Sequence, residues 1–368
     1  MDEFITQAQQ RQSPQRTYSH IDEELEALLA QQKAAIRVVG CGGAGNNTVN
    51  RIGEIGVEGA QTVAINTDAQ DLLYCTADTK ILIGRSLTKG LGAGSIPKIG
   101  EESAREQEQD IRQSLQGADL VFITCGLGGG TGTGSAPIVA EIAKKQGALV
   151  IGIVTIPFHM EGARRKDNAQ YGLERLQENV DTLIVIPNDK LLEIAPDLPI
   201  HTAFKVADEI LTNSVKGIAE LVTKAGLVNL DFADIKTVMG KGGVALIGVG
   251  ESDTSDRAKQ AVTKAVNNPL LDANIKGANG ALINVIGGPD LTLEEARSIV
   301  EEISEELDED ARVIWGAQIR DDLEGTVRVM IIVTGVSSPQ ITGSTRVKQE
   351  RSEKQAEVKS ELGIEFVD

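Results

Sequence analysis

The segment that most constrains this chain is a run of glycines broken by two threonines, Gly126-Leu127-Gly128-Gly129-Gly130-Thr131-Gly132-Thr133-Gly134. It follows the apolar run Asp119 to Thr124 and precedes Ser135-Ala136-Pro137 and a helical pattern. We therefore expect a strand, a loop with almost no Cβ atoms, and a helix whose first turn accepts the proline. Inward-turned N–H groups, threonine hydroxyls and the helix N-terminus all favour an anion. A tight turn needs only one or two glycines, so the segment predicts a phosphate-binding loop.

Length and composition favour two domains built mainly from aliphatic side chains. The chain has 368 residues, more than one domain usually holds, so an additional arm or tail is also expected. Its hydrophobic content of 41% supplies sizeable cores, yet only 3% of the residues are aromatic. Cores of Ala, Val, Ile and Leu favour a parallel α/β architecture over an aromatic-rich β-sandwich.

The charge balance argues against polyanionic partners. Thirty-six basic and 54 acidic residues give a net charge of −18, which repels nucleic acid and anionic lipid at long range. The same acidity is compatible with a saline cytoplasm, and composition does not separate the two causes. Neither nucleic acid binding nor direct membrane insertion is expected.

Cysteine spacing and the N-terminal sequence bear on the cellular compartment. Cys41, Cys75 and Cys125 are odd in number and far apart, with only three histidines to join them. A disulfide framework and a structural zinc site are therefore not expected. The Gln-rich stretch from Met1 to Thr17 lacks a signal-peptide core, and no run of 18 apolar residues occurs. We expect a cytoplasmic protein.

From Ile36 onward, short apolar runs alternate with amphipathic segments, which is typical of a parallel sheet with helices on both faces and right-handed crossovers. The expected strands are 36–39, 62–65, 81–83, 119–124, 148–155 and 182–186, and the expected helices are 46–55, 101–116, 136–146 and 164–178.

A long helical pattern from Thr202 to Ala225 follows, with Gly226 as its stop. Its apolar positions are too broadly spread for a surface helix, so we expect it to lie buried between two domains. After a short helical segment, 234–239, a second block predicts a small mixed-sheet domain. Its expected strands are 244–250, 281–287, 312–319 and 326–336, and its expected helices are 257–267 and 293–307. The expected domain boundaries are 1–35, 36–201, 202–240, 241–336 and 337–368.

Two terminal segments could contact partners. Residues 20–33 have the spacing of a short amphipathic helix, which could dock on its own domain or form a partner-facing arm. The polar tail of residues 337–368 ends in the more apolar Leu362 to Asp368, which is either a docking motif or a frayed end.

A first glycine loop, Gly40 to Asn47, follows the first strand and satisfies the Gly-x-Gly-x-x-Gly pattern. Asp68 ends the next strand, where a ribose-binding acid would stand in a dinucleotide-binding protein. Alone, this loop favours a nicotinamide enzyme. The second loop argues against that function, because two glycine loops on separate strands can wrap a polyphosphate from both sides. No Walker-type lysine motif occurs, so the charge of the phosphates must be neutralised by backbone amides, helix ends and a bound cation. We expect this cation to be Mg²⁺.

A third feature is the acidic stretch Asn229 to Asp234. Asp231 and Asp234 are three residues apart at the start of a helical segment, so both carboxylates can share one face. One of them could simply cap the helix. Paired acids can also position and polarise an attacking water in phosphoryl transfer. They follow the long helix, however, so they could lie far from the glycine loops.

In these motifs the chain resembles FtsZ, the prokaryotic tubulin-like cell-division GTPase family, and more closely its archaeal members. Gly128 to Gly134 matches the highly specific signature G-G-G-T-G-T-G. The other matching loops, in order, are Gly40 to Asn47, Asn66-Thr67-Asp68, Gly90 to Gly94, Pro157-Phe158, Ile186 to Asp189 and Asn229 to Asp234. The resemblance runs from about Ile36 to Val336. It implies an α/β fold in which a Rossmann-like parallel-sheet GTPase domain is joined by a long central helix to a smaller α+β domain.

The resemblance also implies roles for individual residues. Phosphates would lie at Gly43 to Asn47 and at Gly130 to Gly132, and the ribose near Glu161 and Arg165. Asn188 and Asp208 would pair with the guanine edge, and Phe204 would lie against the base. A carboxylate can accept both N1–H and N2–H of guanine, whereas adenine offers no such pair. The full set of expected nucleotide-binding residues is Gly42, Gly43, Ala44, Gly45, Asn46, Asn47, Asp68, Gly128, Gly129, Gly130, Thr131, Gly132, Thr133, Gly134, Glu161, Arg165, Asn188, Phe204 and Asp208.

Asn229, Asp231 and Asp234 resemble the family's synergy loop, which reaches the nucleotide of the next subunit. The resemblance therefore implies a site completed by head-to-tail polymerisation into an open filament. It also implies bound GTP or GDP with Mg²⁺, a possible monovalent cation, and a cytoplasmic protein concentrated at the division site.

The two ends depart from the bacterial pattern. The arm before Ile36 is longer than in bacterial members, and the tail ends in acidic Gly363 to Asp368 instead of a basic peptide. We therefore expect the tail to bind an archaeal-type membrane adaptor resembling SepF.

The resulting hypothesis is a polymerising GTPase whose hydrolysis is completed in trans. Two alternatives belong to other classes. A nicotinamide oxidoreductase built on Gly40 to Gly45 would be protected against unfolding by NAD, and a scaffold that binds GTP without hydrolysing it would release no phosphate.

Overall fold

The structure is a computed structural model that describes residues 34–57, 59–194, 199–224, 228, 231–240, 242–271, 275, 278–308 and 310–336. The chain divides into the segment Met1–Ala34 and one compact unit, Ala35–Asp368, to which the fold described below belongs. The expected amphipathic helix at 20–33 and the tail at 337–368 lie outside the described residues.

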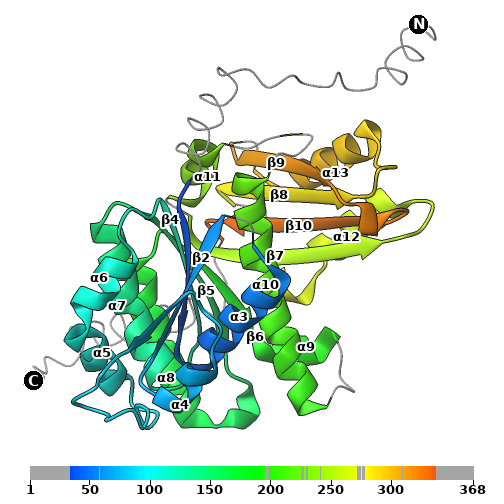
Figure 1. Ribbon diagram of the computed structural model, residues 1–368. Coiled ribbons are helices and arrows are strands. Elements are labelled where there is room, and N and C mark those ends of the chain that lie inside the picture. Colours follow the sequence, from blue (N-terminus) through cyan, green and yellow to red (C-terminus); the bar gives the residue numbers. More distant parts are fainter. Residues whose placement is uncertain are drawn as a thin grey trace, which may run out of the picture. The chain divides into compact units, whose positions relative to one another are not determined.

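The first half of the sheet is parallel. In spatial order its strands are β3 (Thr79–Leu82), β2 (Ala60–Asn66), β1 (Ile36–Cys41), β4 (Leu120–Gly126), β5 (Leu149–Ile156) and β6 (Thr182–Pro187). Except for the edge strand β3, whose Thr79 and Lys80 are exposed, these strands are largely apolar on both faces, because helices cover both sides. Their carboxyl ends therefore share one edge, where Figure 1 shows the loops that open the following helices.

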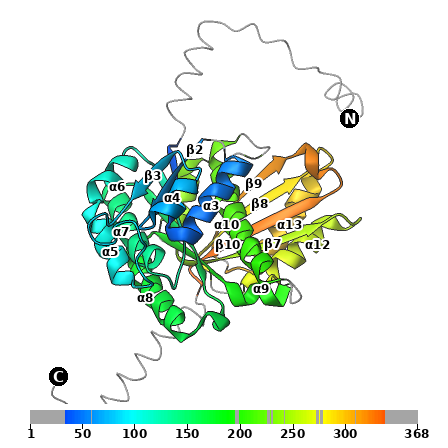
Figure 2. The same cartoon turned by 60° about the horizontal axis from the view of Figure 1, so that its bottom comes forward.

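Each face of this half has its own helices and core. One face carries α5 (Pro97–Glu106), α6 (Glu108–Ser114), α7 (Thr131–Lys145) and α8 (Ala163–Asn179) over side chains such as Val39, Val121 and Ile123. The other face carries α3 (Gly42–Ile55), α9 (Asn188–Ile194) and α10 (Ile200–Thr223) over Val38 and Phe122. Figure 2 separates the two groups. The short helices α4 (Ala69–Tyr74) and η1 (His159–Glu161) complete this half.

Several boundaries differ from those expected. The helices begin inside the glycine segments, at Gly42 and Thr131, so Pro137 lies in the interior of α7 and not in its first turn. Close backbone packing requires glycine there: a Cβ on Gly45 would lie 2.4 Å from the carbonyl oxygen of Thr124. The expected helix 101–116 is two helices that meet at Gln107, whose side chain accepts a hydrogen bond from the backbone N–H of Gly84. Helices α4 and α9 were not anticipated.

The second half of the sheet is mixed. Its order is β7 (Gly243–Ser252), β10 (Val327–Thr334), β8 (Gly280–Gly287) and β9 (Arg312–Ile319), with β10 antiparallel to both neighbours. It carries α11 (Phe232–Met239), α12 (Arg257–Val266), α13 (Leu293–Glu305), η2 (Pro269–Leu271) and η3 (Asp321–Leu323). Because Thr182–Ile184 of β6 pair with Gly243–Ala245 of β7, both halves form one continuous ten-stranded sheet. The exact domain boundaries stay a prediction.

Helix α10 packs against both halves. Its buried Leu211, Val215 and Ile218 belong to one apolar core with strand residues of the first half and with Leu282 and Ile332 of the second. The approach is close, since a Cβ on Gly217 would lie 2.0 Å from Cε of Met330. Within the described residues, no helix has the length and apolar character needed to cross a bilayer.

Candidate functional site

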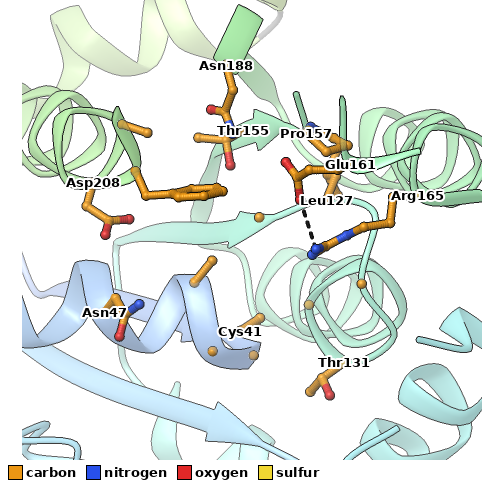
Figure 3. A pocket seen from close by; sticks show the side chains of 18 of the residues that line it. Cys41, Asn47, Leu127, Thr131, Thr155, Pro157, Glu161, Arg165, Asn188 and Asp208 are labelled. Atoms are coloured by element: carbon orange, nitrogen blue, oxygen red, sulfur yellow. Dashed lines mark ion pairs between the residues drawn. The ribbon is translucent and has the colours of Figure 1, made fainter. Parts of the chain in front are cut away.

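A cleft of about 340 Å³ lies at the carboxyl ends of the parallel strands. Both glycine segments contribute to it, together with η1, α9 and the first turns of α10 (Figure 3). Its lining consists of Cys41, Gly42, Gly43, Ala44, Asn47, Gly126, Leu127, Gly129, Gly130, Thr131, Gly132, Thr155, Pro157, Glu161, Arg165, Asn188, Phe204, Ala207 and Asp208.

Two helix N-termini meet at the floor of this cleft. The N-cap residues of α3 and α7, Cys41 and Gly130, make no side-chain cap hydrogen bond, and neither helix has an acidic residue in its first turn. The two segments touch: Gly42 has φ +71°, and a Cβ on it would lie 2.8 Å from the backbone nitrogen of Gly132. Uncapped helix ends that converge in this way offer backbone donors and positive potential to an anion. The floor is therefore suited to phosphate.

One ion pair crosses the cleft wall. Glu161 Oε2 lies 2.8 Å from Nη1 of Arg165 (Figure 3), and its other carboxylate oxygen accepts a hydrogen bond from the backbone N–H of Phe158 at 2.8 Å. The carboxylate is thus held by the η1 turn, while the guanidinium stays exposed. A cation at the mouth of a cleft favours an anionic ligand.

The opposite end of the cleft combines an aromatic ring with polar side chains. Phe204 is 40% exposed, and its ring packs edge-on against Phe158, with centroids 5.2 Å apart and planes at 86°. Asn188 is buried, and its Oδ1 has no hydrogen-bond partner among the described residues. Burial raises the pKa of the Asp208 carboxyl to about 6. A flat ring with adjacent N–H donors would stack on Phe204 and satisfy both oxygen acceptors.

Some expected residues lie behind the lining. The side chain of Asp68 caps α4 by accepting hydrogen bonds from the backbone N–H groups of Gln70 and Asp71. The hydroxyl of Thr133 accepts from Gly128 N–H at 3.0 Å. Gly45, Asn46, Gly128 and Gly134 are also outside the lining. These residues shape the loops, while the other expected residues of this set face the cleft.

The lining also includes Thr155 and Ala207, which the sequence did not single out. Four further residues belong to the predicted loops but were not named as individual binding residues: Cys41, Gly126, Leu127 and Pro157. Most are apolar or stand at strand ends, so their sequence signal is that of a core residue. Burial raises the pKa of the Cys41 thiol to about 12, which leaves it neutral at the floor of the cleft.

The acidic pair lies at the other edge of the sheet. The side chain of Asp231 accepts from Asp234 N–H at 2.8 Å, and that of Asp234 from Asp231 N–H at 3.3 Å, which forms a capping box on α11. Both residues are exposed. The carbonyl of Met239, at the end of α11, accepts from the hydroxyl of Thr182, which begins β6. The pair thus belongs to the amino ends of the strands, and Asn229 lies outside the described residues.

Helix α10 separates these acids from the cleft. It has 24 residues and is therefore about 36 Å long, with Phe204 and Asp208 near its first turns and the acidic segment after its last. One subunit does not bring Asp231 or Asp234 to its own cleft. Within the described residues, no group of three His, Cys, Asp or Glu side chains could hold a metal ion.

Comparisons with known proteins match both halves of the chain. A model of the Tubulin/FtsZ family GTPase domain matches residues 35–196, and a model of the FtsZ family C-terminal domain matches residues 243–337. Cell division protein FtsZ 1 of Thermococcus kodakarensis is 61% identical over 92% of this chain and 90% of its own length. Cell division protein FtsZ of Methanothermobacter thermautotrophicus is 55% identical over 100% and 98%.

A solved structure agrees with this match. An empty FtsZ dimer from M. jannaschii is 61% identical and superposes with a TM-score of 0.83, covering 86% of this chain and 93% of that one. The expected α/β class is thereby confirmed. Because the matches include the cleft, α10 and both halves of the sheet, the chain belongs to the FtsZ family of tubulin-like GTPases, among its archaeal members.

Proposed function

We propose that this protein is a GTP-dependent, polymerising cytoskeletal GTPase of the cell-division ring, whose hydrolysis is completed in trans by the next subunit. Guanine nucleotide binding follows from membership of a GTPase family, and the relatives are named cell division proteins. The observation that supports the trans mechanism is the separation of the two functional ends along α10, which is about 22 Å from Asp208 to the last helical residue, Thr223.

The cleft fits GTP in three parts. Its phosphates would lie on the uncapped ends of α3 and α7, at Gly43 to Asn47 and Gly130 to Gly132. Its ribose would lie near Glu161 and Arg165, and its base against Phe204. Asp208 would accept N1–H and N2–H of guanine, and the unpartnered Oδ1 of Asn188 supports a further polar contact there.

Charge neutralisation at the phosphates fits a bound Mg²⁺, and a monovalent cation is also compatible. Within the cleft, backbone N–H groups and one arginine are the positive groups the chain offers, and the acidic Asp208 lies at the base end. When bound beside the phosphates at Gly43 to Asn47 and Gly130 to Gly132, Mg²⁺ would supply positive charge that stabilises phosphoryl transfer.

The acids complete the site from outside. Asp231 and Asp234, with Asn229, would reach the terminal phosphate of a neighbour, where their carboxylates orient and polarise the attacking water. Such a contact joins two different surfaces of identical subunits, so it propagates as an open filament. Hydrolysis removes the terminal phosphate from this contact, and the loss of the interactions that the phosphate makes there weakens the filament.

The tail provides the route to the membrane in this proposal. Residues Leu362 to Asp368 would bind a membrane adaptor resembling SepF, which would concentrate the cytoplasmic filament at the division site. The chain needs such an adaptor because its net charge of −18 opposes direct contact with anionic lipid.

A complementation experiment tests catalysis in trans. One variant, Asp208→Asn, keeps the acids but should exchange guanine for xanthine, because its amide accepts N1–H and donates to O2. The other, Asp231→Asn with Asp234→Asn, keeps the cleft but lacks the acids. We expect GDP production to be low for each variant alone with GTP and XTP, and to recover on mixing. Equal GDP production by the second variant with and without the first would overturn the mechanism.

Two measurements accompany this test. Light scattering with GTP and with GDP reports assembly, and phosphate release followed in parallel separates a GTPase from a scaffold that only binds GTP. Activity per subunit should rise steeply with protein concentration, and a flat profile would contradict hydrolysis in trans.

A further inference from the structure

Two free cysteines that are far apart in the sequence lie side by side beneath the floor of the cleft. Cys41 is the last residue of β1, and Cys125 is the last but one of β4. These strands pair in parallel, and the pairing of Gly40 with Thr124 places Cys41 and Cys125 at the next matched position. Both side chains belong to the apolar core on the α7 side of the sheet, so they point the same way.

This pair touches both helix N-termini of the floor. Cys41 is the N-cap residue of α3 and lines the cleft, whereas Cys125 is completely buried behind it. A Cβ added to Gly132, in the first turn of α7, would lie 2.8 Å from the carbonyl oxygen of Cys41 and 3.2 Å from Cβ of Cys125. A ligand held between the two sulfurs would therefore lie directly beneath the loop that the phosphates are expected to contact.

Both thiols are neutral in the free protein. Burial raises the pKa of Cys41 to about 12, and burial together with the nearby Cys41 raises the pKa of Cys125 well above its usual range. A neutral thiol makes only weak hydrogen bonds, and neither sulfur has a role in the proposed hydrolysis. The pair thus consists of two soft ligands that the proposed function does not use.

The strand geometry fits a bridging ion better than a disulfide. Neighbouring strands lie about 4.7–4.9 Å apart, and matched side chains of parallel strands start with about this separation. A disulfide needs Cβ atoms about 3.5–4.5 Å apart, so its formation would draw the strands together. With the zinc–sulfur distance of about 2.3 Å as a guide, two metal–sulfur bonds in line span about 4.6 Å, which matches the strand spacing.

Two thiolates without further ligands favour a particular class of ion. Within the part of the chain that the structure describes, no group of three His, Cys, Asp or Glu side chains could complete a tetrahedral zinc site. Thiolates select soft cations such as Cu⁺, which two thiolates in line can satisfy. Binding would release both thiol protons to the solvent and leave a complex with a net charge of −1. The N-termini of α3 and α7 stabilise an anion at this position.

We propose that Cys41 and Cys125 form a two-coordinate site for Cu⁺, and that the occupied site opposes nucleotide binding. The site itself is independent of the proposed function, whereas the competition rests on the proposed binding of GTP. An anionic complex beneath Gly132 uses the same helix ends as the phosphates and repels them. By linkage, Cu⁺ and nucleotide should weaken each other's binding by one common factor, about five- to 150-fold for a typical coupling between sites.

A titration of the full chain without nucleotide tests the site. Under anaerobic conditions a coloured Cu⁺–bicinchoninate complex supplies the ion, and the loss of its absorbance reports transfer to the protein. We expect one Cu⁺ per subunit. Cys41→Ser and Cys125→Ser should each weaken binding at least about a hundredfold, because even the outer partners of metal ligands contribute 10- to 100-fold. Cys75→Ser should retain binding, since Cys75 is also buried but packs in a separate cluster with Val49 and Leu72.

X-ray absorption at the copper edge identifies the ligands in the unmodified chain, so the test does not depend on the folding of a variant. Two sulfur neighbours and no nitrogen or oxygen neighbour would support the site. A nitrogen or oxygen ligand, or a third sulfur, would overturn it. The absence of transfer with protein in excess over bicinchoninate, or an equal loss of binding in Cys75→Ser, would overturn it as well.

The affinity for a fluorescent GTP analogue, measured below the assembly concentration with and without Cu⁺, tests the competition. We expect a loss of at least about fivefold in the unmodified protein and none in Cys125→Ser, which excludes capture of Cu⁺ by the nucleotide itself. Unchanged affinity with the site filled would overturn the competition. If the analogue does not bind even without Cu⁺, the proposed binding of GTP is wrong, and the copper titration still decides the site.

Discussion

The two ends of α10 carry carboxylates in opposite circumstances. Near its amino end, burial raises the pKa of Asp208 to about 6, so the chain holds this acid where ionisation is unfavourable. Beyond its other end, Asp231 and Asp234 are exposed and satisfied by a capping box. Asp208 is thus prepared for a ligand that replaces water, whereas the capping pair remains solvated until another surface covers it. In the proposed function, Asp208 recognises the base, and the capping pair completes the site of a neighbouring subunit.

The largest expected effect comes from the capping pair. Asp231→Asn should lower GTP hydrolysis by roughly 10² to 10⁴, the range for a positioned acid or base, and should leave GTP affinity unchanged. Asn caps a helix about as well as Asp, so α11 should keep its start. Phosphate release at assembly-competent concentration, measured beside nucleotide binding, checks both statements.

The control for that variant is Thr292→Ala. It removes a capping box of the same kind at α13, where the side chain of Thr292 accepts from Glu295 N–H. We expect a stability loss of about 1 kcal/mol with normal hydrolysis. Normal GTP hydrolysis by Asp231→Asn would contradict the catalytic role of the capping pair.

The next effect concerns the recognition end. Asp208→Asn should weaken GTP binding by about 10² or more, because a site built to accept two N–H donors then presents an N–H to one of them. XTP affinity should rise in the same variant. Competition between the two nucleotides measures the exchange, and an unchanged preference would remove Asp208 from the base contact.

The pH dependence of binding gives a smaller effect at the same residue. In the proposed base contact, guanine needs the Asp208 carboxylate, whose pKa in the free protein is about 6. Lowering the pH from 7 to 5 protonates it, so GTP affinity should fall by about tenfold per pH unit below 6. The phosphates of GTP titrate in the same way with the unmodified protein and with Asp208→Asn. The difference between the pH profiles of GTP affinity for these two proteins therefore isolates the contribution of Asp208. Identical profiles would contradict the assignment.

The smallest effect is on the stability of the nucleotide-free protein. The Asp208 pKa rises from 3.8 in the unfolded chain to about 6 in the folded one. The stabilisation of the folded state by the protonated carboxyl is therefore fully present below pH 3.8 and is lost as the pH rises through 6. Asp208→Asn should therefore raise the melting temperature slightly at pH 8 relative to pH 4. Melting curves at both pH values measure this, and Asp231→Asn, which changes an exposed acid, should show no such gain.

The sequence predicted the strand and helix succession because aliphatic runs and amphipathic segments alternate clearly. The sequence-based prediction was wrong where tertiary packing determines the helix boundaries. Glycines have low helix propensity, yet the first turns of α3 and α7 contain them, because the close approach of Gly45 to Thr124 and of Gly134 to Pro97 leaves no room for a side chain. The break at Gln107 depends on a contact with Gly84, which no local pattern reveals.

The candidate site was predictable to different degrees. Glycine loops carry a local signal, because repeated glycine after a strand has few other uses. Asn188, Phe204 and Asp208 have no such signal, and only the family resemblance singled them out. Pro157 was found only as part of a loop that matches the family, and Thr155 and Ala207 could not be found at all, since nothing in the sequence separates a side chain that lines a cleft from one that lines a core.

The length of α10 has a further consequence for any assembly of this chain. If the far end of one copy covers the cleft of the next, successive nucleotides stand about one α10 apart, on the order of 36 Å plus the loops between the copies. The length of the helix then sets the distance between subunits along the polymer, which fibre diffraction would record as an axial repeat.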